Sequence, residues 1–434
     1  MYYYKQNQIF KMWLCVEKTD SLEGVVEAPP SKSYTHRALI VSMLAKKSRI
    51  RNPLISSDTM ATKNACESLG AEILEKNGDW IVNGVDGIID VKRDVIDVKN
   101  SGTTLRFIAS LAALSKKEVE ITGDKSIRQR PISELLNGLK DLAYIKDTNG
   151  FAPIRIRNKG DIEDVSIKIR GDISSQFISS LLLIAPMIGL EIIITTPLKS
   201  KPYVDITIDV MKKAGIDIKK TDNGFYVKKQ KYKNIDYKIP GDFSSAANIL
   251  CPCSFIESNV EIKNLSMDDK QGDKRVIDIL RDIGAILKIK KNSVKIMNGE
   301  NLNAMNIDAS DIPDLVPPLV SVFCFSNGTS LIKNIEHLKY KECNRLNACK
   351  EFRKLGVDIE IGDDKILIKG PNRIKSATLR AFNDHRMVMA LASAAMKAES
   401  GVTRIDSADM LNVSFPKYLE DMQRLGARMW IENG

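Results

Sequence analysis

The sequence has little of what secreted, metal-binding or membrane-spanning proteins need. Its seven cysteines are an odd number without a CxxC pair, which indicates free thiols in a reducing compartment and no disulfide framework. The three histidines lie far apart and none shows metal-ligand spacing to another His or Cys, so we expect no metal and no cofactor. A secretion-type N-terminus and an apolar run of about 18 residues are both missing, which predicts a cytoplasmic protein with no membrane partner.

Aromatic residues are also scarce, at 6% of the chain, and no five basic residues follow one another. Lys and Arg outnumber Asp and Glu by 65 to 55, a formal net charge of +10. This excess suits anionic small substrates or nucleic acid, and it is equally compatible with a solvated basic surface. A stacking platform for single-stranded nucleic acid has few aromatic side chains to be built from.

With 434 residues, the chain is too long for one ordinary core and predicts two domains or a repeat array. Its most informative stretch, residues 29–45, reads PPSKSYTHRALIVSMLA, a polar turn that opens into an apolar helix. Lys32 stands at the start of that helix, where a cation costs a few tenths to ~1 kcal/mol unless an anion lies beside it. The turn is therefore a candidate anion site.

The same design of polar turn and apolar helix returns about every 70 residues. The six stretches are 31–45, 100–114, 171–187, 241–253, 309–324 and 383–396. A second amphipathic helix closes each unit, and in five units it ends at a glycine suited to a left-handed C-cap, namely Gly70, Gly215, Gly284, Gly356 and Gly426. The second unit has no such glycine, and its helix is predicted from residue 131 through 142 to 144. Strand-like pieces rich in β-branched residues, such as 192–196, 260–262 and 365–368, complete a βαβαβ unit.

Six units divide naturally into two domains of three, and the fold class is mixed α/β. We predict an N-terminal domain of residues 30–240 and a C-terminal domain of residues 241–434 that also takes up 1–29 as an N-terminal strand. The charged segment 228–238 is the predicted crossing between them. If the turns of both domains face one cleft, their helix N-termini create a positive site, and we expect the active site there.

Cations cluster near these turns, where phosphates and carboxylates would bind. They are Lys32, Arg37, Arg106, Arg130, Lys341, Arg345 and Arg386. Arginine offers a planar fork for bidentate contact with such groups. Any one of them alone is more readily explained as surface charge, but Arg106 and Arg386 fall near the starts of apolar helices, where the helix dipole disfavours them unless an anion is shared.

Ordered motifs along essentially the whole chain resemble the 5-enolpyruvylshikimate-3-phosphate synthase family of enolpyruvyl transferases. The motifs are PSKSYTHRAL from residue 30, NSGTTLR from 100, RQRPI from 128, GDISSQF from 171, SKPYVDIT from 200, IPD from 312, KECNRL from 341, NDHRM from 383 and SFP from 414. The resemblance implies an inside-out α/β barrel in two domains and no nucleic-acid partner. It also implies transfer of the enolpyruvyl (1-carboxyvinyl) group of phosphoenolpyruvate to the 5-hydroxyl of shikimate 3-phosphate by addition and elimination, in aromatic amino acid biosynthesis. We expect a monomer.

The resemblance also assigns roles to single residues. Catalysis falls to Asp314 as general base, Glu342 as proton donor and Lys32. Phosphoenolpyruvate is expected at Lys32, Asn100, Gly102, Arg130, Arg345 and Arg386. Shikimate 3-phosphate is expected at Ser33, Arg37, Ser174, Ser175, Gln176, Ser200, Tyr203, Asp314 and Lys341. Arg106 has a supporting role. Without the family, an Asp after Pro and a serine pair at a helix start are ordinary caps, which is how we interpret the fourth turn, 241–245.

One departure and three alternatives accompany this assignment. Many members of the family carry a lysine where Val413 stands, so one cation near phosphoenolpyruvate is missing. The sister transferase that acts on UDP-N-acetylglucosamine typically has a reactive cysteine in the second unit, and residues 122–130 contain none. An RNA-terminal phosphate cyclase-like protein shares part of the architecture, but no ATP- or RNA-binding motif is visible. A non-catalytic relative is the remaining possibility.

Overall fold

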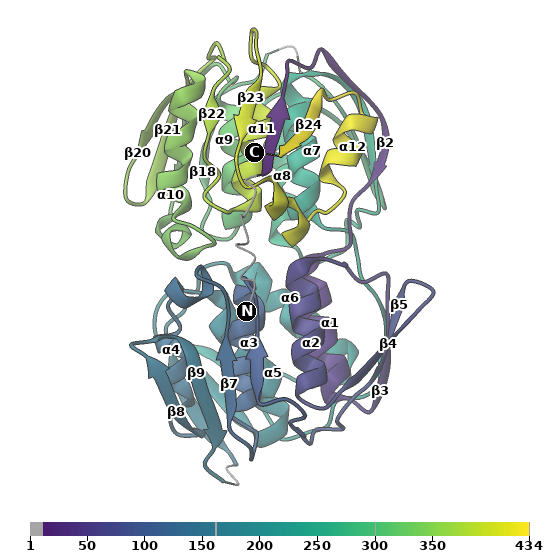
Figure 1. Cartoon of the computed structure of the whole chain (residues 1–434), viewed down its shortest axis with the longest axis vertical. Coiled ribbons are helices and arrows are strands. Elements are labelled where there is room, and N and C mark those ends of the chain that lie inside the picture. The colour runs from purple at the N-terminus through teal and green to yellow at the C-terminus, as the bar shows by residue number, and fades with distance from the viewer. Residues whose placement is uncertain (1–11, 161–162, 300, 434) are drawn as a thin grey trace, which may run out of the picture.

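The computed structural model describes residues 12–160, 163–299 and 301–433. Two lobes stand one above the other in Figure 1, the lower built from the first half of the chain and the upper from the second half. Strand β2 (Ser21–Glu27) belongs to the upper lobe although it precedes the whole lower lobe in sequence. The part of residues 1–29 before Met12 lies outside the described residues.

Six four-stranded sheets are formed by the described residues, three in each lobe. In the lower lobe their spatial orders are β14-β3-β5-β4, β6-β7-β9-β8 and β10-β11-β13-β12. The bounds are β3 Lys47–Arg51, β4 Glu72–Lys76, β5 Asp79–Asn83, β6 Val95–Asp97, β7 Val119–Thr122, β8 Ala143–Thr148, β9 Phe151–Asn158, β10 Val165–Ile169, β11 Leu190–Ile194, β12 Lys219–Thr221, β13 Gly224–Val227 and β14 Asp236–Lys238.

The upper lobe repeats this arrangement with the orders β2-β15-β17-β16, β18-β19-β21-β20 and β22-β23-β1-β24. Its remaining strands are β1 Met12–Val16, β15 Glu257–Lys263, β16 Ile286–Lys290, β17 Ser293–Met297, β18 Asn306–Asp308, β19 Gly328–Lys333, β20 Asp358–Ile361, β21 Lys365–Gly370, β22 Thr378–Leu379, β23 Thr403–Ile405 and β24 Met429–Asn433. The three strand-like pieces predicted from the sequence overlap β11, β15 and β21.

All six sheets share one pattern of strand directions. The first two strands run parallel, and the other two neighbours pair antiparallel. A parallel pair needs a crossover, which in four sheets is the first helix of the unit, whereas β2 and β14 pair with strands from distant parts of the chain. The repeating unit is therefore βαβαββ, one strand more than the βαβαβ expected from the sequence.

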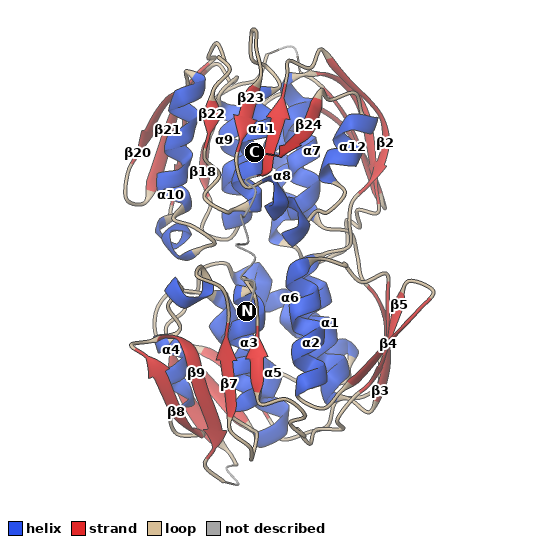
Figure 2. Cartoon of the chain, viewed as in Figure 1, coloured by secondary structure: helices blue, strands red, loops and turns tan. Residues whose placement is uncertain are grey.

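Helices fill the inside of each lobe and sheets cover the outside (Figure 2), the inside-out arrangement that the sequence motifs imply. The first helices of the six units are α1 Lys32–Leu44, α3 Gly102–Ala112, α5 Ser175–Ile188, α7 Phe243–Phe255, α9 Val316–Phe323 and α11 His385–Ala395. Eleven of the thirteen residues of α1 are buried, and such all-round burial is expected of helices enclosed by sheets. Each helix starts one to seven residues after the first residue of its predicted stretch, because the first residues form the polar turn that caps the helix. Before α9 this turn includes a short 3-10 helix, η3 Pro313–Leu315.

The second helices are α2 Ser57–Ser68, α4 Ser133–Leu139, α6 Lys201–Lys213, α8 Val276–Asp282, α10 Arg345–Ala348 continued by η5 Cys349–Leu355, and α12 Tyr418–Arg424. The five predicted cap glycines follow five of them, and all five have φ between 76° and 113°. A left-handed backbone is what glycine permits at a helix C-terminus, so this prediction is confirmed. The predicted helix of the second unit is wrong at its end, because α4 stops at Leu139 and Tyr144 lies in β8.

Two separate hydrophobic cores hold the lobes. One joins buried residues between Tyr34 and Ile239, and we call the part of the molecule around it the N-terminal lobe. The other joins Leu14, Val16, Leu22, Val26 and Ala28 to buried residues of the second half and defines the C-terminal lobe. The predicted domain boundaries, 30–240 and 1–29 with 241–434, stay a prediction.

The chain passes between the lobes at two adjacent segments. Ser31 N donates to Pro240 O at 2.8 Å, and Asp242 N donates to Pro29 O at 2.8 Å. The charged segment 228–238 does not make the crossing predicted for it, because its last residues form β14 and pair with β3 inside the N-terminal lobe. A sequence pattern cannot distinguish a charged linker from a charged edge strand, since both are solvent-exposed.

Two negative findings concern the described residues. None of their helices is long and apolar enough to cross a membrane, and they contain no group of three or more His, Cys, Asp or Glu side chains able to hold a metal ion.

Candidate active site

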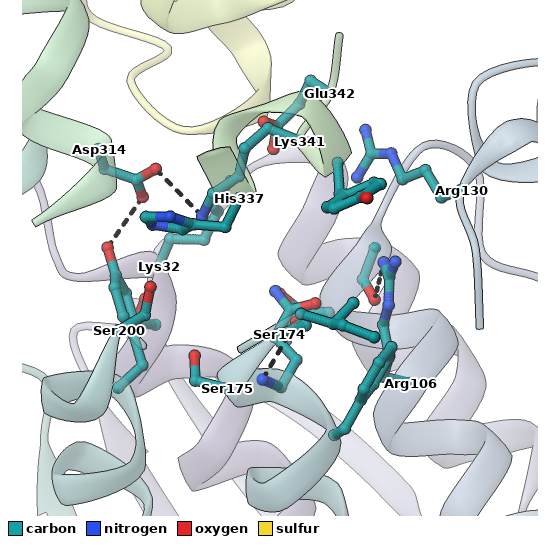
Figure 3. Close-up of a pocket in the computed structure, with 18 of the residues that line it drawn as sticks. Lys32, Arg106, Arg130, Ser174, Ser175, Ser200, Asp314, His337, Lys341 and Glu342 are labelled. Atoms are coloured by element: carbon teal, nitrogen blue, oxygen red, sulfur yellow. Dashed lines mark hydrogen bonds and ion pairs between the residues drawn. The ribbon is translucent and has the colours of Figure 1, made fainter. Parts of the chain in front are cut away.

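One cavity opens where the two lobes meet, and both lobes line it (Figure 3). In this ligand-free structure ≈ 90 Å³ of the cavity is available to the centres of water molecules. Fourteen of the residues predicted from the sequence line it: Lys32, Ser33, Arg37, Gly102, Arg106, Arg130, Ser174, Ser175, Gln176, Ser200, Tyr203, Asp314, Lys341 and Glu342. Helix starts of both lobes therefore face one cleft, which is the condition under which the sequence predicts the active site there.

At the start of α1, Lys32 is the cation that the sequence places beside an anion. In the ligand-free structure its Nζ lies 3.0 Å from Oδ2 of Asp58 on α2, while Oδ1 of Asp58 is buried without a hydrogen-bond partner. Asp58 also lines the cavity. The carboxylate thus takes the position beside the ammonium that a substrate anion can share or replace.

Arg37, one turn further along α1, is held mainly by the protein itself. Its guanidinium donates to Thr207 Oγ1 at 2.6 Å, Ser33 O at 3.0 Å, Tyr203 O at 2.9 Å and Ser179 Oγ at 3.3 Å. A guanidinium has five N–H donors, so only one is left for a ligand. Burial lowers the pKa of Arg37 to about 10, which leaves it charged at neutral pH.

Gly102 begins α3 beneath two guanidinium groups. A Cβ at this position would lie 2.4 Å from Nη1 of Arg106 and 2.6 Å from Nη1 of Arg130. No carboxylate of the described residues makes an ion pair with either arginine, and the Nε atoms of both are buried without a partner. Burial and the neighbouring Arg130 lower the pKa of Arg106 to about 9. Two adjacent, unneutralised cations over a glycine form a site for an anion.

A buried hydrogen-bond chain fixes this start of α3. His36 Nδ1 lies 2.6 Å from Thr62 Oγ1, which lies 2.6 Å from Thr104 Oγ1, and that hydroxyl donates to Ser101, the N-cap of α3, at 2.7 Å. Because Thr104 donates to Ser101, it accepts from Thr62, and Thr62 accepts from His36. The chain therefore requires a proton on Nδ1 of His36. Burial, Lys32 and Arg37 keep the pKa of His36 well below its usual value, so the imidazole carries that proton in its neutral form.

The starts of α5 and α6 carry the predicted hydroxyl and amide ligands. Ser174 caps α5 by accepting from Gln176 N at 3.3 Å, and the Gln176 side chain donates to Thr103 Oγ1 at 3.0 Å. Ser200 has a left-handed φ of 56° before α6, and its amide donates to Ser310 O of the C-terminal lobe at 2.9 Å. This strained turn aims the start of α6 at the other lobe.

The C-terminal lobe contributes a carboxylate surrounded by cations. Asp314 lies 2.7 Å from Arg345 Nη1, 2.9 Å from Arg386 Nη2 and 3.7 Å from Lys341 Nζ. Tyr203 from the N-terminal lobe donates to Asp314 Oδ2 at 2.9 Å. Burial alone would raise the pKa of Asp314, but Arg386, Lys341 and Arg345 hold it well below its usual value. Asp314 is therefore a carboxylate that can accept both a hydrogen bond and, in a reaction, a proton.

Glu342 and Asp384 complete this network through Arg345. Arg345 ion-pairs with Glu342 and contacts Asp384 Oδ2 through Nε at 2.7 Å. Burial would raise the pKa of Glu342, but Arg345 and then Arg130 hold it well below its usual value. In Figure 3, Glu342 and Lys341 reach into the cavity from the C-terminal lobe, opposite Arg106 and the serines of α5.

Three predicted phosphoenolpyruvate ligands do not line the cavity themselves. Arg345 and Arg386 lie behind Asp314 and contact it, and Asn100 donates weakly to Met410 Sδ at 3.9 Å. Val413, the position of the missing lysine, is buried in the 3-10 helix η6 Ala408–Val413.

Seven lining residues were missed by the sequence prediction, the apolar Pro131, Ile173 and Phe177 and the polar Asp58, Thr103, His337 and Tyr340. Both ring nitrogens of His337 are buried without a partner, and burial, Lys341 and Lys199 lower its pKa to about 3. A lone histidine within a short 3-10 helix, η4 Glu336–Tyr340, carries no pattern that would have revealed it.

The fold belongs to the class of enolpyruvyl transferases. The structure of EPSP synthase from Acinetobacter baumannii is similar with a TM-score of 0.82 and 21% identity, over 98% of this chain and 100% of that one. The enolpyruvyl transferase NikO from Streptomyces tendae is similar with a TM-score of 0.80 and 16% identity, over the same shares of the two chains. At these identities the likeness establishes the architecture.

The chain belongs to the EPSP synthase (3-phosphoshikimate 1-carboxyvinyltransferase) family, whose profile matches residues 16–422. It is 47% identical to the 3-phosphoshikimate 1-carboxyvinyltransferase of Methanocaldococcus jannaschii, over 96% of this chain and 99% of that protein. The corresponding protein of Methanothermobacter thermautotrophicus is 39% identical over the same shares. These relatives favour neither the UDP-N-acetylglucosamine transferase nor the RNA cyclase alternative.

Proposed function

We propose that this protein transfers the enolpyruvyl group of phosphoenolpyruvate to the 5-hydroxyl of shikimate 3-phosphate and releases phosphate, in aromatic amino acid biosynthesis. The observation that carries the proposal is the cleft between the lobes, where unneutralised Arg106 and Arg130 face the carboxylates Asp314 and Glu342. The two arginines can bind the anionic groups of the two substrates, and the two carboxylates can accept and donate the protons that the reaction transfers. Membership of the family supports the same reaction.

In the proposed addition step, Asp314 accepts the proton of the 5-hydroxyl while the oxygen attacks C2 of phosphoenolpyruvate. C3 receives a proton from Glu342, and a tetrahedral intermediate results. In the elimination step Glu342 takes a proton back from C3, the C2–O bond to phosphate breaks, and the phosphate leaves with the proton held by Asp314. Glu342 must carry a proton to begin the cycle, although the ligand-free site stabilises its carboxylate through Arg345 and Arg130. A bound dianion that engages those arginines removes this stabilisation and raises the pKa of Glu342.

Phosphoenolpyruvate is assigned to the side of Lys32, Gly102 and Arg130, with Asn100, Arg345 and Arg386 as further ligands. Arg345 and Arg386, which pair with Asp314 in the ligand-free structure, would bind the substrate by exchanging this carboxylate for that of phosphoenolpyruvate. Lys32 makes the same exchange with Asp58 and stays beside the reacting atoms.

Shikimate 3-phosphate is assigned to the N-terminal lobe. Its proposed ligands are Ser33, Arg37, Ser174, Ser175, Gln176, Ser200 and Tyr203, with Asp314 and Lys341 from the other lobe. Helix starts with free N–H groups bind phosphate well, and Ser174 and Ser175 stand at the start of α5. The hydrogen bond from Tyr203 to Asp314 supports a general base close to the proposed shikimate 3-phosphate ligands.

We further propose that the lobes open to admit substrates and close around them, and that the two domains are 30–240 and 1–29 with 241–434. Within the described parts of the chain, only two adjacent segments, near Pro29 and Pro240, join the lobes covalently, as a hinge requires. Small-angle scattering should give a smaller radius of gyration with saturating shikimate 3-phosphate and phosphate than without ligands. An unchanged radius contradicts closure.

The experiment that tests the function measures phosphate release from phosphoenolpyruvate with shikimate 3-phosphate or UDP-N-acetylglucosamine as acceptor. Turnover is expected with the first alone. Turnover only with the nucleotide sugar, or with neither acceptor, contradicts the proposal. We also expect a cytoplasmic monomer, to be checked by fractionation of the source cells and by light scattering after size-exclusion chromatography.

A further inference from the structure

Behind the wall of the active site lies a buried carboxyl group that the proposed reaction does not use. Asp273 stands in the 3-10 helix η2 Gly272–Arg275, immediately before α8, and is 2% exposed. Ser244 Oγ donates to its Oδ2 at 2.5 Å, while its Oδ1 is buried without a hydrogen-bond partner. A buried carboxylate oxygen left unpaired is costly, so this atom calls for an explanation.

Oδ1 has a cavity of its own beside the active site. Ser33, Tyr203, Ser244 and Gln271 line this cavity together with Asp273, and ≈ 10 Å³ is available to the centre of a water molecule, which is about the room that one water needs. Gln271 is not a free partner, because its amide oxygen accepts from Phe243 N and its amide nitrogen donates to Gly241 O and Asp269. Ser33 and Tyr203 line the main cavity as well.

The hydrogen bonds around this cavity have a fixed direction. Tyr203 uses its hydroxyl proton on Asp314 Oδ2, so the tyrosine oxygen can only accept from the cavity. Ser244 donates to Oδ2 of Asp273, so in the neutral acid the proton lies on Oδ1 and points into the cavity. No donor of the described residues reaches Oδ1, whereas the neutral acid brings its own donor to this position.

We propose that Asp273 is a positioning residue for the general base: as a neutral carboxylic acid it donates from Oδ1 across the small cavity toward Tyr203, and thereby orients the hydroxyl that donates to Asp314. This inference rests on the proposed function and adds a residue outside the substrate-contacting set. The link from Asp273 to Tyr203 passes through one water molecule.

The charges around Asp273 favour the neutral form. Asp314 and Arg386 face it from the C-terminal lobe, Asp242 from the N-cap of α7, and Tyr203 from α6. Burial, followed by the negative charge of Asp314, raises the pKa of Asp273 to about 7, although Arg386 and the Ser244 hydrogen bond oppose this. Above that pH the Oδ1 proton leaves to solvent, the donor is lost, and a new negative charge lies behind the proposed shikimate 3-phosphate site.

A pH dependence follows with a definite sign. As pH rises from 6 to 8.5, the KM for shikimate 3-phosphate of the wild-type enzyme should increase, on the order of tenfold if the bound dianion shifts the pKa of Asp273 by about one unit. Asp273→Asn keeps an oxygen for Ser244 and an N–H donor for the cavity but cannot ionise. Its KM should therefore stay near the low-pH wild-type value across this range.

The matched control is Asp269→Asn. Asp269 lies four residues away, and burial raises its pKa to about 6, but its carboxylate accepts from Gln271 and not from the site. This variant should keep the wild-type pH dependence. Ionisation of the substrate phosphate affects all three proteins equally, so the difference between them isolates Asp273.

Parallel KM profiles for wild type and Asp273→Asn, with both proteins active, would falsify the inference and leave the proposed function intact. Loss of turnover in the wild type itself is instead a failure of the proposed function. If Asp273→Asn does not fold, titration calorimetry of the wild type with shikimate 3-phosphate at pH 7.5, in buffers of different ionisation enthalpy, decides the question. Net proton uptake on binding is expected, and its absence overturns the inference.

Discussion

On the N-terminal side of the cleft, Arg106 and Arg130 stand over Gly102 with no ion pair among the described residues. On the C-terminal side, Arg345 and Arg386 are engaged by carboxylates, with Asp314 between them and Asp384 behind. One side thus offers an open anion site, and the other holds its cations in an internal network. The difference fits the proposed reaction. The two carboxylates that would transfer protons, Asp314 and Glu342, lie on the C-terminal side and form ion pairs with its cations.

The two sides also differ in how their helix starts are held. Neutral hydrogen bonds from His36 through Thr62 and Thr104 fix α3, whereas charged pairs fix the residues around α10 and α11. Neutral bonds are insensitive to salt and to a passing anion, while charged pairs can exchange partners with a ligand. We therefore expect the N-terminal side to be preformed and the C-terminal side to rearrange on binding.

The largest effect should come from removing the carboxylates that distinguish the C-terminal side. Asp314→Asn and Glu342→Gln should each lower kcat by roughly 10²–10⁴-fold, the usual range for general acid–base groups. Asp314→Asn should also tighten phosphate binding, because Arg345 and Arg386 lose a competing anion. Steady-state kinetics and phosphate titration measure both effects.

The matched control for these variants is Asp278→Asn, an exposed residue of α8 outside the cleft. Its kcat should equal that of the wild type. A wild-type kcat in Asp314→Asn or Glu342→Gln removes that residue from the mechanism.

A smaller effect should follow from disturbing the open anion site. Gly102→Ala places a methyl group 2.4 and 2.6 Å from the Nη1 atoms of Arg106 and Arg130, so at least one guanidinium must move. We expect the KM for phosphoenolpyruvate to rise about 10–100-fold, equivalent to roughly 1.4–2.8 kcal/mol of binding free energy, with a smaller change in the KM for shikimate 3-phosphate. Gly362→Ala, whose added Cβ meets first the flexible side chain of Lys365 at 3.1 Å, is the control and should change neither KM. Equal increases in both KM values contradict an anion site specific to phosphoenolpyruvate.

The third prediction concerns acid stability on the N-terminal side. Burial, Lys32 and Arg37 depress the pKa of His36 in the folded state, whereas the unfolded value is about 6.5. Its contribution to stability is therefore present above pH 6.5 and is lost as pH falls below 6.5 toward the folded pKa. His36→Asn keeps a donor for Thr62 without a titrating ring, so its Tm, followed by circular dichroism, should fall less between pH 7.5 and 5 than that of the wild type. The same decrease in both proteins contradicts this account of His36.

The smallest effect is expected from Thr62→Val, which interrupts the hydrogen-bond chain of α3. The Nδ1–H of His36 loses its acceptor in a buried position, at a cost of roughly 1–3 kcal/mol in unfolding free energy. Because the chain ends at the cap of α3, the KM for phosphoenolpyruvate should rise while kcat changes little. Chemical denaturation measures the loss of unfolding free energy, and steady-state kinetics measures the KM. An unchanged KM would mean that the hydrogen-bond chain contributes to stability alone.

Much of the architecture could be predicted because each unit repeats a local signal. Polar caps, apolar helices and glycine C-caps depend on neighbours within a few residues, so the six first helices and the five left-handed glycines are visible in the sequence. The failures have different causes. The segment 228–238 became an edge strand through pairing with the distant strand β3. The additional strand of the unit forms a hairpin with the strand just before it, as β5 does with β4 and β9 with β8, so this local signal was missed.

The sequence by itself determined the repeat, the helix starts and the set of charged residues that those starts present, because these follow from spacing and from side-chain chemistry. Only the tertiary structure decided which charges neutralise one another. It pairs Lys32 with Asp58, leaves Arg106 and Arg130 open, and buries Asp273 behind Tyr203. Charge compensation and desolvation depend on distances of a few ångströms between residues far apart along the chain, and those distances exist only once both lobes have folded and met.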